Sequence, residues 1–220
     1  MSPADAPVKL SSRGERTREA LVRAGRRLFA VHAVDAVAID DIVQGASVAK
    51  GSFYNHFPDK DALLRAIIAE IRAGIEIAVA RANHGVENPA RRVARAVCVY
   101  LRHALDDPER AGVLARMNAG SGSLEAPMNR GLIEDISAGL AAGTFAVATV
   151  EVGVLYVFGL AQVSLARVAE TPELGATVAL AQQICALLLR GLSVPAAEAD
   201  LIAAQSADEI IRRGELEATT

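Results

Sequence analysis

The stretch from Ser47 to Lys60 constrains the fold of this chain more than any other part of the sequence. On a helix, Phe53 and Phe57 fall one turn apart on the same side, where both rings can point into a core. The opposite side carries small or polar residues, namely Gly51, Ser52 and Asn55. Pro58 disfavours helical geometry at the residue before it, so the helix is predicted to end there. The pattern predicts a short helix held by two aromatic side chains, with a face that can approach another surface closely.

A second short helix is predicted just before this one, over residues 39–46. Its inner face would carry Ile39, Ile42, Val43 and Ala46. Asp40 and Asp41 lie near its N-terminus, where the helix dipole favours negative charge. Two short helices joined by a tight turn, the second with a small polar outer face, are typical of a helix-turn-helix.

The segment from Ile42 to Lys60 resembles the DNA-binding signature of the TetR-type (TetR/AcrR) family of transcriptional repressors. The matching positions are Ile42, Ala46, Val48, Gly51, Phe53, Tyr54, Phe57 and Lys60. The resemblance covers about residues 16–68, and the remaining chain is similar to the family only in length and helical layout. It implies an all-α protein with an N-terminal three-helix module containing the helix-turn-helix, followed by a helical domain that binds a ligand and dimerises.

Three positions depart from the usual family pattern. Ala38 stands where the family usually has Thr, Ser47 where it usually has Gly, and Ala49 where it often has Ser. Each departure removes a side-chain cap or a residue that tolerates positive φ, at a cost of about 0.5–2 kcal/mol. We expect the departures to affect hydroxyl–phosphate contacts and to leave the fold intact.

The resemblance implies a set of residues at the DNA: Arg16, Thr17, Gln44, Lys50, Gly51, Ser52, Tyr54, Asn55, His56 and Lys60. Those expected mostly at phosphates are Lys50, Tyr54, His56 and Lys60. Those expected at base edges are Gln44, Ser52 and Asn55. Residues 9–27 contain seven Lys or Arg against two Glu, a net charge of +5, whereas the whole chain carries −3. This asymmetry favours a nucleic-acid face at the N-terminal end, although a charged stretch can also be an ordinary solvated helix face.

The composition predicts helices packed on helices. The chain is 52% hydrophobic but has no Trp and only 4% aromatic residues, so Ala, Leu, Val and Ile must fill its core. We expect a disordered tail or basic arm over residues 1–13, the DNA-binding domain over 14–60, and the ligand-binding and dimerisation domain over 61–220. The helices expected in the last domain span about residues 61–81, 89–105, 108–118, 124–142, 148–169, 173–192 and 195–213.

Residues 148–169 and 173–192 carry apolar side chains nearly all round. A helix of this kind is buried on every side, in a protein core or in a membrane. A membrane span is disfavoured, because polar residues such as Glu151 and Arg167 leave less than the ~20 apolar residues that a span needs. Burial against a second subunit explains the pattern better. The resemblance implies the same, since the two penultimate helices of such proteins form a four-helix bundle between two chains.

The resemblance further implies a small-molecule effector, bound between the central helices, that releases the repressor from a palindromic double-stranded operator. The candidate lining residues are Tyr100, His103, Arg116, Met117, Met128, Tyr156, Phe158 and Gln162. For each of them, ordinary core packing is the alternative, and it is the commoner role for such residues. With so few aromatic residues, the cavity is expected to suit an apolar or mixed molecule of unknown identity.

Catalysis is not expected, because the chain has no His-Glu-x-x-His, Gly-x-Ser-x-Gly or Cys-x-x-Cys motif and no glycine-rich phosphate loop. No metal and no cofactor are predicted. Cys98 and Cys185 lie among apolar residues in a chain without a signal peptide, which indicates reduced thiols and a cytoplasmic protein. A second hypothesis is a helical small-molecule-binding protein whose DNA-binding end is vestigial, as the departures at Ala38, Ser47 and Ala49 would allow.

Overall fold

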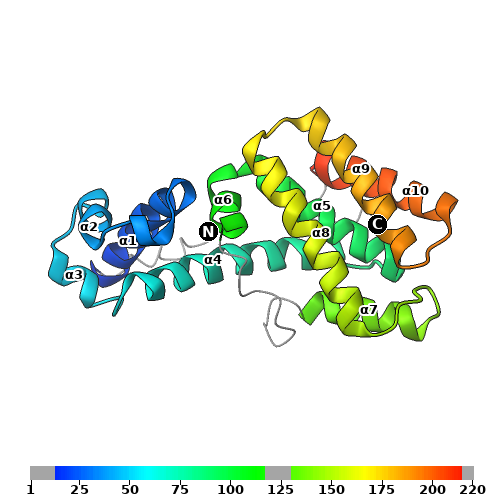
Figure 1. The fold of residues 1–220 in the computed structure, drawn as a ribbon, viewed down its shortest axis with the longest axis horizontal. Coiled ribbons are helices and arrows are strands. Elements are labelled where there is room, and N and C mark those ends of the chain that lie inside the picture. The colour runs from blue at the N-terminus through cyan, green and yellow to red at the C-terminus, as the bar shows by residue number, and fades with distance from the viewer. Residues whose placement is uncertain (1–12, 117–129, 215–220) are drawn as a thin grey trace, which may run out of the picture. The chain divides into compact units, whose positions relative to one another are not determined.

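The computed structural model describes residues 13–116 and 130–214, and all the regular structure in these two ranges is helical (Figure 1). This confirms the predicted all-α class. The chain forms two compact units, unit 1 up to Ile67 and unit 2 from Ile68 onward. The division falls inside one long helix, so this helix contributes its first turns to unit 1 and the rest to unit 2. The predicted N-terminal tail or arm lies outside the described residues, apart from Arg13 at the start of the first helix.

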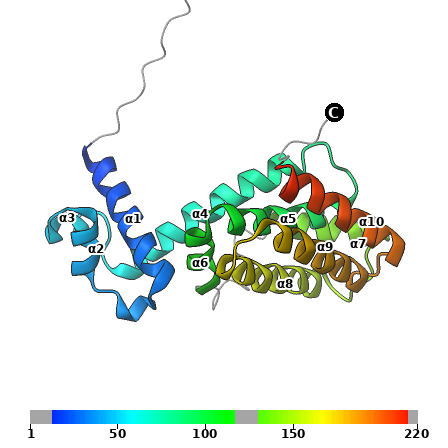
Figure 2. The same ribbon diagram turned by 90° about the horizontal axis from the view of Figure 1, so that it is seen from above.

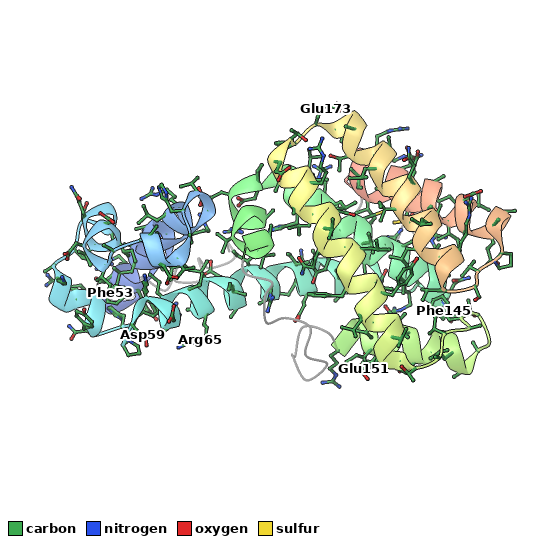
Figure 3. All side chains as sticks on the ribbon, in the orientation of Figure 1. Phe53, Asp59, Arg65, Phe145, Glu151 and Glu173 are labelled. Atoms are coloured by element: carbon green, nitrogen blue, oxygen red, sulfur yellow. The ribbon has the colours of Figure 1, made fainter. Side chains whose placement is uncertain are left out.

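Unit 1 consists of three α-helices, a short 3₁₀ turn and the start of the long helix. Its elements are α1 (Arg13–Val31), η1 (Val34–Ala36), α2 (Ile39–Ala46), α3 (Lys50–Tyr54) and α4 (Lys60–Ala82). Its core is formed by residues that are at most 1% exposed, namely Leu21, Phe29, Ile42, Phe53, Leu63 and Ile67 (Phe53 is labelled in Figure 3). α1 and α4 approach closely at Gly25, where an added Cβ would lie 2.8 Å from Cδ2 of Leu63. The predicted helix-turn-helix is therefore present, and its aromatic residues do face a core.

α3 is shorter than the sequence predicted, because it ends at Tyr54 rather than just before Pro58. The backbone N–H groups of His56 and Phe57 both donate to the carbonyl of Phe53, each at 2.9 Å. Two donors on one carbonyl give a tightened final turn rather than continued α-helix. Phe57 nevertheless remains buried, so the turn keeps the second aromatic ring in the core of unit 1.

Unit 2 is a bundle built around α5 (Pro89–Asp106). The other elements are α6 (Pro108–Arg116), α7 (Arg130–Ala141), α8 (Val150–Glu170), α9 (Leu174–Gly191), α10 (Ala196–Ser206) and the π-helical turn η4 (Ala207–Arg212). α5 contacts all six of them (Figure 2). The predicted helix 195–213 is thus divided, because the hydrogen bonding changes from α to π at Ala207. The predicted helix 124–142 begins outside the described residues, and α7 covers its second part.

Local signals explain where several of these helices begin. Asn88 caps α5 by accepting a hydrogen bond from the backbone N–H of Arg91 at 3.0 Å, with Pro89 at the first helical position. Thr149 caps α8 through the N–H of Val152 at 3.2 Å. The carboxylate of Glu173 caps α9 by accepting from Gly175 N–H at 2.8 Å (Figure 3).

α8 and α9 each bury one side in unit 2 and leave apolar side chains exposed on the other. On α8, Val154 and Leu165 are at most 1% exposed, whereas Val163 is 71% exposed. The remaining exposed apolar residues of the two helices are Val152, Leu155, Leu174 and Leu187. Both helices are long and apolar enough to cross a membrane, with mean hydropathies of 1.6 and 1.4. Core helices of soluble proteins often have such compositions, and both helices enter the core of unit 2 here.

Candidate nucleic-acid interface and ligand cavity

The outer face of α3 and of the turn after it is polar and accessible. Lys50, Gly51 and Asn55 are exposed, and Tyr54 is 52% exposed although its ring packs edge-on against Phe53. Ser52 and His56 are half-buried. The predicted DNA-facing residues of α3 and of the turn after it are therefore exposed or half-buried, whereas Phe53 between them is buried.

Lys50 forms an ion pair that joins the two helices of the helix-turn-helix. Its Nζ lies 2.8 Å from Oδ1 of Asp40 on α2. The hydrogen bond and the negative charge of Asp40 raise the pKa of Lys50 above its usual range, so the ammonium stays charged. A phosphate at this position would have to share the ammonium with Asp40.

Lys60 stands at the start of α4 and binds two backbone carbonyls of unit 1. Its Nζ donates to the oxygen of Val34 at 2.7 Å and to that of Val37 at 3.3 Å. An ammonium has three protons, so one remains for a phosphate. The sequence predicted only the phosphate contact, because nothing in the local pattern shows that the link around η1 returns to this lysine.

The other predicted DNA-facing residues lie on α1 and α2. Arg16 is exposed, Thr17 donates its hydroxyl to the carbonyl of Arg13 at 3.0 Å, and Gln44 is exposed near the end of α2. α1 supports this end of α2, because Nη2 of Arg27 donates to the carbonyl of Gly45 at 3.3 Å. The turn between the helices places Ser47 at φ 56° and ψ 44°, the left-handed geometry for which the family usually has Gly.

Unit 2 contains a cavity of about 580 Å³, the ligand cavity, lined by the last part of α4 and by α5, α7 and α8. Its apolar lining includes Val79, Ala96, Val97, Val157, Phe158 and Ala161. Its polar lining includes Glu76, Asn83, His84, Arg92, Tyr100, Arg130, Glu134 and Asp135. The volume lies in the usual range for small-molecule sites, roughly 300–1,000 Å³, and apolar walls combined with polar groups are typical of them.

Two of the predicted lining residues, Tyr100 and Phe158, line this cavity, and Tyr156, His103 and Gln162 are not among its lining residues. The hydroxyl of Tyr156 donates to the carbonyl of Leu187 on α9 at 3.3 Å. His103 lies beside Asp107 and Arg110, and burial lowers the pKa of its imidazole. Gln162 is buried in α8. Met117, Met128 and the side chain of Arg116 lie outside the described residues.

The polar end of the ligand cavity was missed by the sequence analysis. Nη1 of Arg92 donates to the carbonyls of Asn83 and Val86 at 3.2 and 3.3 Å, and its Nε pairs with Oδ1 of Asp135. Burial raises the pKa of the Asp135 carboxyl, and the Arg92 guanidinium opposes this shift. Asn83, Arg92 and Asp135 come from three different parts of the chain, so no local sequence pattern indicates that they meet.

Comparison with known families covers both units. Residues 21–67 match the model for bacterial regulatory proteins of the tetR family, and residues 88–205 match that for the tetracyclin repressor-like C-terminal domain. The second match alone spans more than half of the chain. The chain belongs to the TetR family. Members of this family are transcription regulators, and this confirms the resemblance of the helix-turn-helix segment.

Solved structures of TetR-family proteins align along most of the chain. RolR in complex with resorcinol is 29% identical, with a TM-score of 0.68, over 87% of this chain and 95% of the RolR chain. A TetR-like transcriptional regulator from Rhodococcus sp. RHA1 is 21% identical, with a TM-score of 0.65, over 84% of this chain and 99% of its own. A γ-butyrolactone receptor (ArpA-like protein) is 19% identical, with a TM-score of 0.65, over 90% of this chain and 100% of its own. The last two show the fold alone. A comparison with curated proteins finds no match.

Proposed function

We propose that this TetR-family regulator is a cytoplasmic, dimeric repressor that binds a palindromic operator. A small molecule that binds in the ligand cavity, without being chemically converted, releases the repressor from the operator. The observation that carries the proposal is the course of α4. Its first turns pack in unit 1, through Leu63 and the carbonyl contacts of Lys60, and its later turns line the ligand cavity through Glu76 and Val79. One continuous helix therefore takes part in both the DNA-binding unit and the cavity.

α4 supplies a mechanical reason for release. It is 23 residues long, which corresponds to about 34 Å of helix. A small tilt at the cavity end would displace the first turn by several ångströms. Two half-sites read in successive major grooves lie about 34–36 Å apart, so such a displacement spoils the spacing of the two DNA-binding units of a dimer. The ligand must then bind more tightly to the conformation that cannot fit DNA than to the conformation that can.

The exposed apolar residues of α8 and α9 support the dimer. Val163 at 71% exposure and Leu187 at 55% are more accessible than large apolar side chains usually are. Pairing these two helices with the same helices of a second copy would bury these residues in a two-fold interface. A two-fold protein predicts two inverted half-sites in the operator.

The test is a reciprocal titration with DNA taken from around the protein's own gene. Binding is first measured by fluorescence anisotropy at low and high salt. Ligands found by thermal shift are then titrated into the free protein and into the protein–DNA complex. A coupling of about 1–3 kcal/mol lowers operator affinity about 5- to 150-fold, and linkage requires the same factor in ligand affinity. Because RolR binds resorcinol, small phenols are the first compounds to test. Equal ligand affinities in the two titrations would contradict release by that ligand.

The division of labour at the DNA can be tested with two variants. Lys60→Ala should weaken binding to all sequences alike and lower the salt slope by about 1, because the lysine can offer one proton to a phosphate. Asn55→Ala should relax sequence preference at a cost of about 1–3 kcal/mol, because its exposed amide is expected at a base edge. Since Lys60 also holds Val34 and Val37, a thermal melt must show that the variant is folded. Identical behaviour of both variants across a set of operator sequences would contradict these roles.

The second hypothesis is a ligand-binding protein with a vestigial DNA-binding end, and it is motivated by Ser47 and Ala49. Ser47 adopts the left-handed turn geometry, and Ala49 precedes α3 without a side-chain cap. Specific DNA binding in the anisotropy experiment would exclude this hypothesis. Ligand binding with only weak, sequence-independent DNA binding would favour it.

A further inference from the structure

Asn83 places an unsatisfied hydrogen-bond acceptor in the wall of the ligand cavity. The residue is 4% exposed, and its Nδ2 donates to the carbonyl of Arg92 at 3.1 Å. Its Oδ1 is buried and has no hydrogen-bond partner in the part of the chain that the structure describes. Exchanging the two amide atoms would bring an oxygen against the carbonyl of Arg92, so the partner of Nδ2 determines the orientation. An unpaired buried acceptor of this kind is costly and calls for a donor.

Asp135 adds a second acceptor close by. Nε of Arg92 pairs with Oδ1 of Asp135, while Nη1 of the same guanidinium donates to the backbone carbonyl of Asn83. Arg92 therefore brings Asn83 and Asp135 to one end of the cavity. Among residues 13–116 and 130–214, Asp135 is paired through its Oδ1, so its Oδ2 remains an acceptor. The side chain is only 7% exposed. Oδ1 of Asn83 and Oδ2 of Asp135 can therefore both accept a hydrogen bond at this end of the cavity.

The charges around the cavity disfavour an anionic ligand. The lining contains two arginines and three carboxylates, and the arginines are already paired, Arg92 with Asp135 and Arg130 with Glu134. The third carboxylate is that of Glu76. No excess of positive charge is left to offset the cost of burying an anion.

The rest of the cavity offers an apolar wall and two more polar side chains, His84 and Tyr100. Arg92, Ala96 and Tyr100 follow each other at intervals of four on α5, so they share a face of the helix. Tyr100 lies eight residues, or about 12 Å, along α5 from Arg92. Burial raises the pKa of Tyr100 to about 12, so its hydroxyl stays neutral and can donate or accept a hydrogen bond.

We infer that the effector is an uncharged small molecule that carries a hydroxyl or neutral amine donor on an apolar body, and that Asn83 and Asp135 accept this donor. The inference rests on the proposed function in one respect, namely that the ligand cavity is where the effector binds. It goes beyond that function by assigning the chemical class of the ligand and the two residues that select it. A donor that reaches both oxygens fills the unmet acceptor of Asn83, whereas an ether or a hydrocarbon of the same shape leaves it unpaired.

The experiment uses matched ligands on the full-length protein. The panel contains phenol, resorcinol, cyclohexanol, aniline and 1-naphthol, the fully O-methylated or N,N-dimethylated derivative of each, which has no donor, and benzoate and 1-naphthoate as anions. Binding is measured by thermal shift and by calorimetry up to 10 millimolar ligand. We expect donors to bind at least about tenfold more tightly than their methylated partners, because the methylated compounds leave the acceptor unpaired, and we expect the carboxylates to bind weakest.

Two variants locate the selection. Asn83→Leu removes the acceptor, so the ratio between a donor and its methylated partner should fall toward one. Phe158→Leu is the matched control, because it removes apolar contact from the same cavity and should weaken both ligands without changing their ratio. The wild-type ratio decides the question alone if Asn83→Leu does not fold.

Three results would overturn the inference. The first is equal binding of ethers and donors, which would mean that a water molecule donates to the Asn83 oxygen. The second is tighter binding of the carboxylates. The third is that no donor in the panel binds. Failure of the inference is separable from that of the proposed function. If a carboxylate or an ether releases the protein from DNA, the proposed function stands and the inference that the effector must carry a donor is wrong. If a donor binds with the expected preference over its methylated partner but leaves DNA binding unchanged, the selection by Asn83 stands and release by that ligand is wrong.

Discussion

At the scale of single residues, the absence of a side chain lets neighbouring parts of unit 2 touch. A Cβ at Gly139 on α7 would overlap the ring of Phe145, which is 3% exposed (Figure 3). Gly191 at the end of α9 likewise accepts the ring of Tyr156, whose hydroxyl then reaches the carbonyl of Leu187. These glycines are needed for close approach and not for an unusual backbone conformation, since neither has positive φ.

Gly139→Ala should destabilise the protein by about 1–3 kcal/mol, because the ring of Phe145 must leave its place in the core. Gly74→Ala is the matched control, since a Cβ on this exposed residue of α4 meets nothing within 4 Å. The control should be neutral or stabilise by up to about 1 kcal/mol, because Ala is the better helix former. Urea unfolding followed by circular dichroism measures both. Equal effects of the two substitutions would mean that Phe145 does not occupy this position.

His103 should make stability fall on mild acidification. Burial lowers its pKa, an effect that Arg110 reinforces and that Asp106 and Asp107 oppose, and its Nε2 is buried without a partner among the described residues. His103 has a pKa of about 6.5 in the unfolded chain, so below this pH it takes up a proton there more readily than in the folded protein. Stability is therefore full above about pH 6.5 and declines as the pH falls through the folded pKa. Melting temperatures between pH 7.5 and 5.5 should drop less for His103→Gln than for the wild type. An equal drop would show that other groups cause the acid sensitivity.

At the scale of elements, α5 holds the end of the described chain. Arg95 is 1% exposed, donates through Nε to the carbonyl of Ala82 at 2.8 Å, and pairs with Glu209 on η4. Arg91 binds the same carboxylate at 2.8 Å. One acidic residue of a π-helical turn thus pairs with two arginines of the central helix, and it joins η4 to the part of the bundle where α4 ends.

Glu209→Gln should cost about 3 kcal/mol of stability, because it leaves the buried guanidinium of Arg95 without its counter-charge. Glu170→Gln, at an exposed residue of α8, should stay within about 0.5 kcal/mol of the wild type. Both are measured by urea unfolding at neutral pH. If Glu209→Gln matched the control, the ion pairs of η4 would contribute nothing net to folding.

At the scale of the whole molecule, the proposed function needs two copies of the chain. In this proposal the exposed apolar side chains on α8 and α9 would form the interface, with Val163 the most exposed among them. Two symmetric copies are also what a palindromic operator requires.

Val163→Glu should convert the dimer into a monomer and lower operator affinity at least about tenfold, because a charge would be buried in the interface and half of the DNA contacts would be lost. Ile77→Glu is the matched control, since Ile77 is 57% exposed but lies on α4. Sedimentation velocity at micromolar concentration and anisotropy measure the two effects. A dimeric Val163→Glu protein, or a monomeric control, would place the interface elsewhere.

The sequence by itself determined the helices and the helix-turn-helix, because these depend on signals within a few residues. The spacing of Phe53 and Phe57 acts over one turn, and the structure confirms that both rings are buried. The cap at Asn88 acts over a similarly short distance. The apolar surplus of residues 148–169 and 173–192 likewise indicated that more than one side of each helix needs a partner.

Only the tertiary structure decided which polar groups meet. Helical periodicity shows which face of a helix is apolar but not which other helix covers it. Tyr156 and Phe158 lie on the same helix, yet the first reaches α9 and the second lines the ligand cavity. Asn83, Arg92 and Asp135 come together across more than 50 residues of sequence, because the end of α4, the start of α5 and α7 converge around one guanidinium. Pairing at this distance leaves no local pattern, so it depends on the packing of the whole unit.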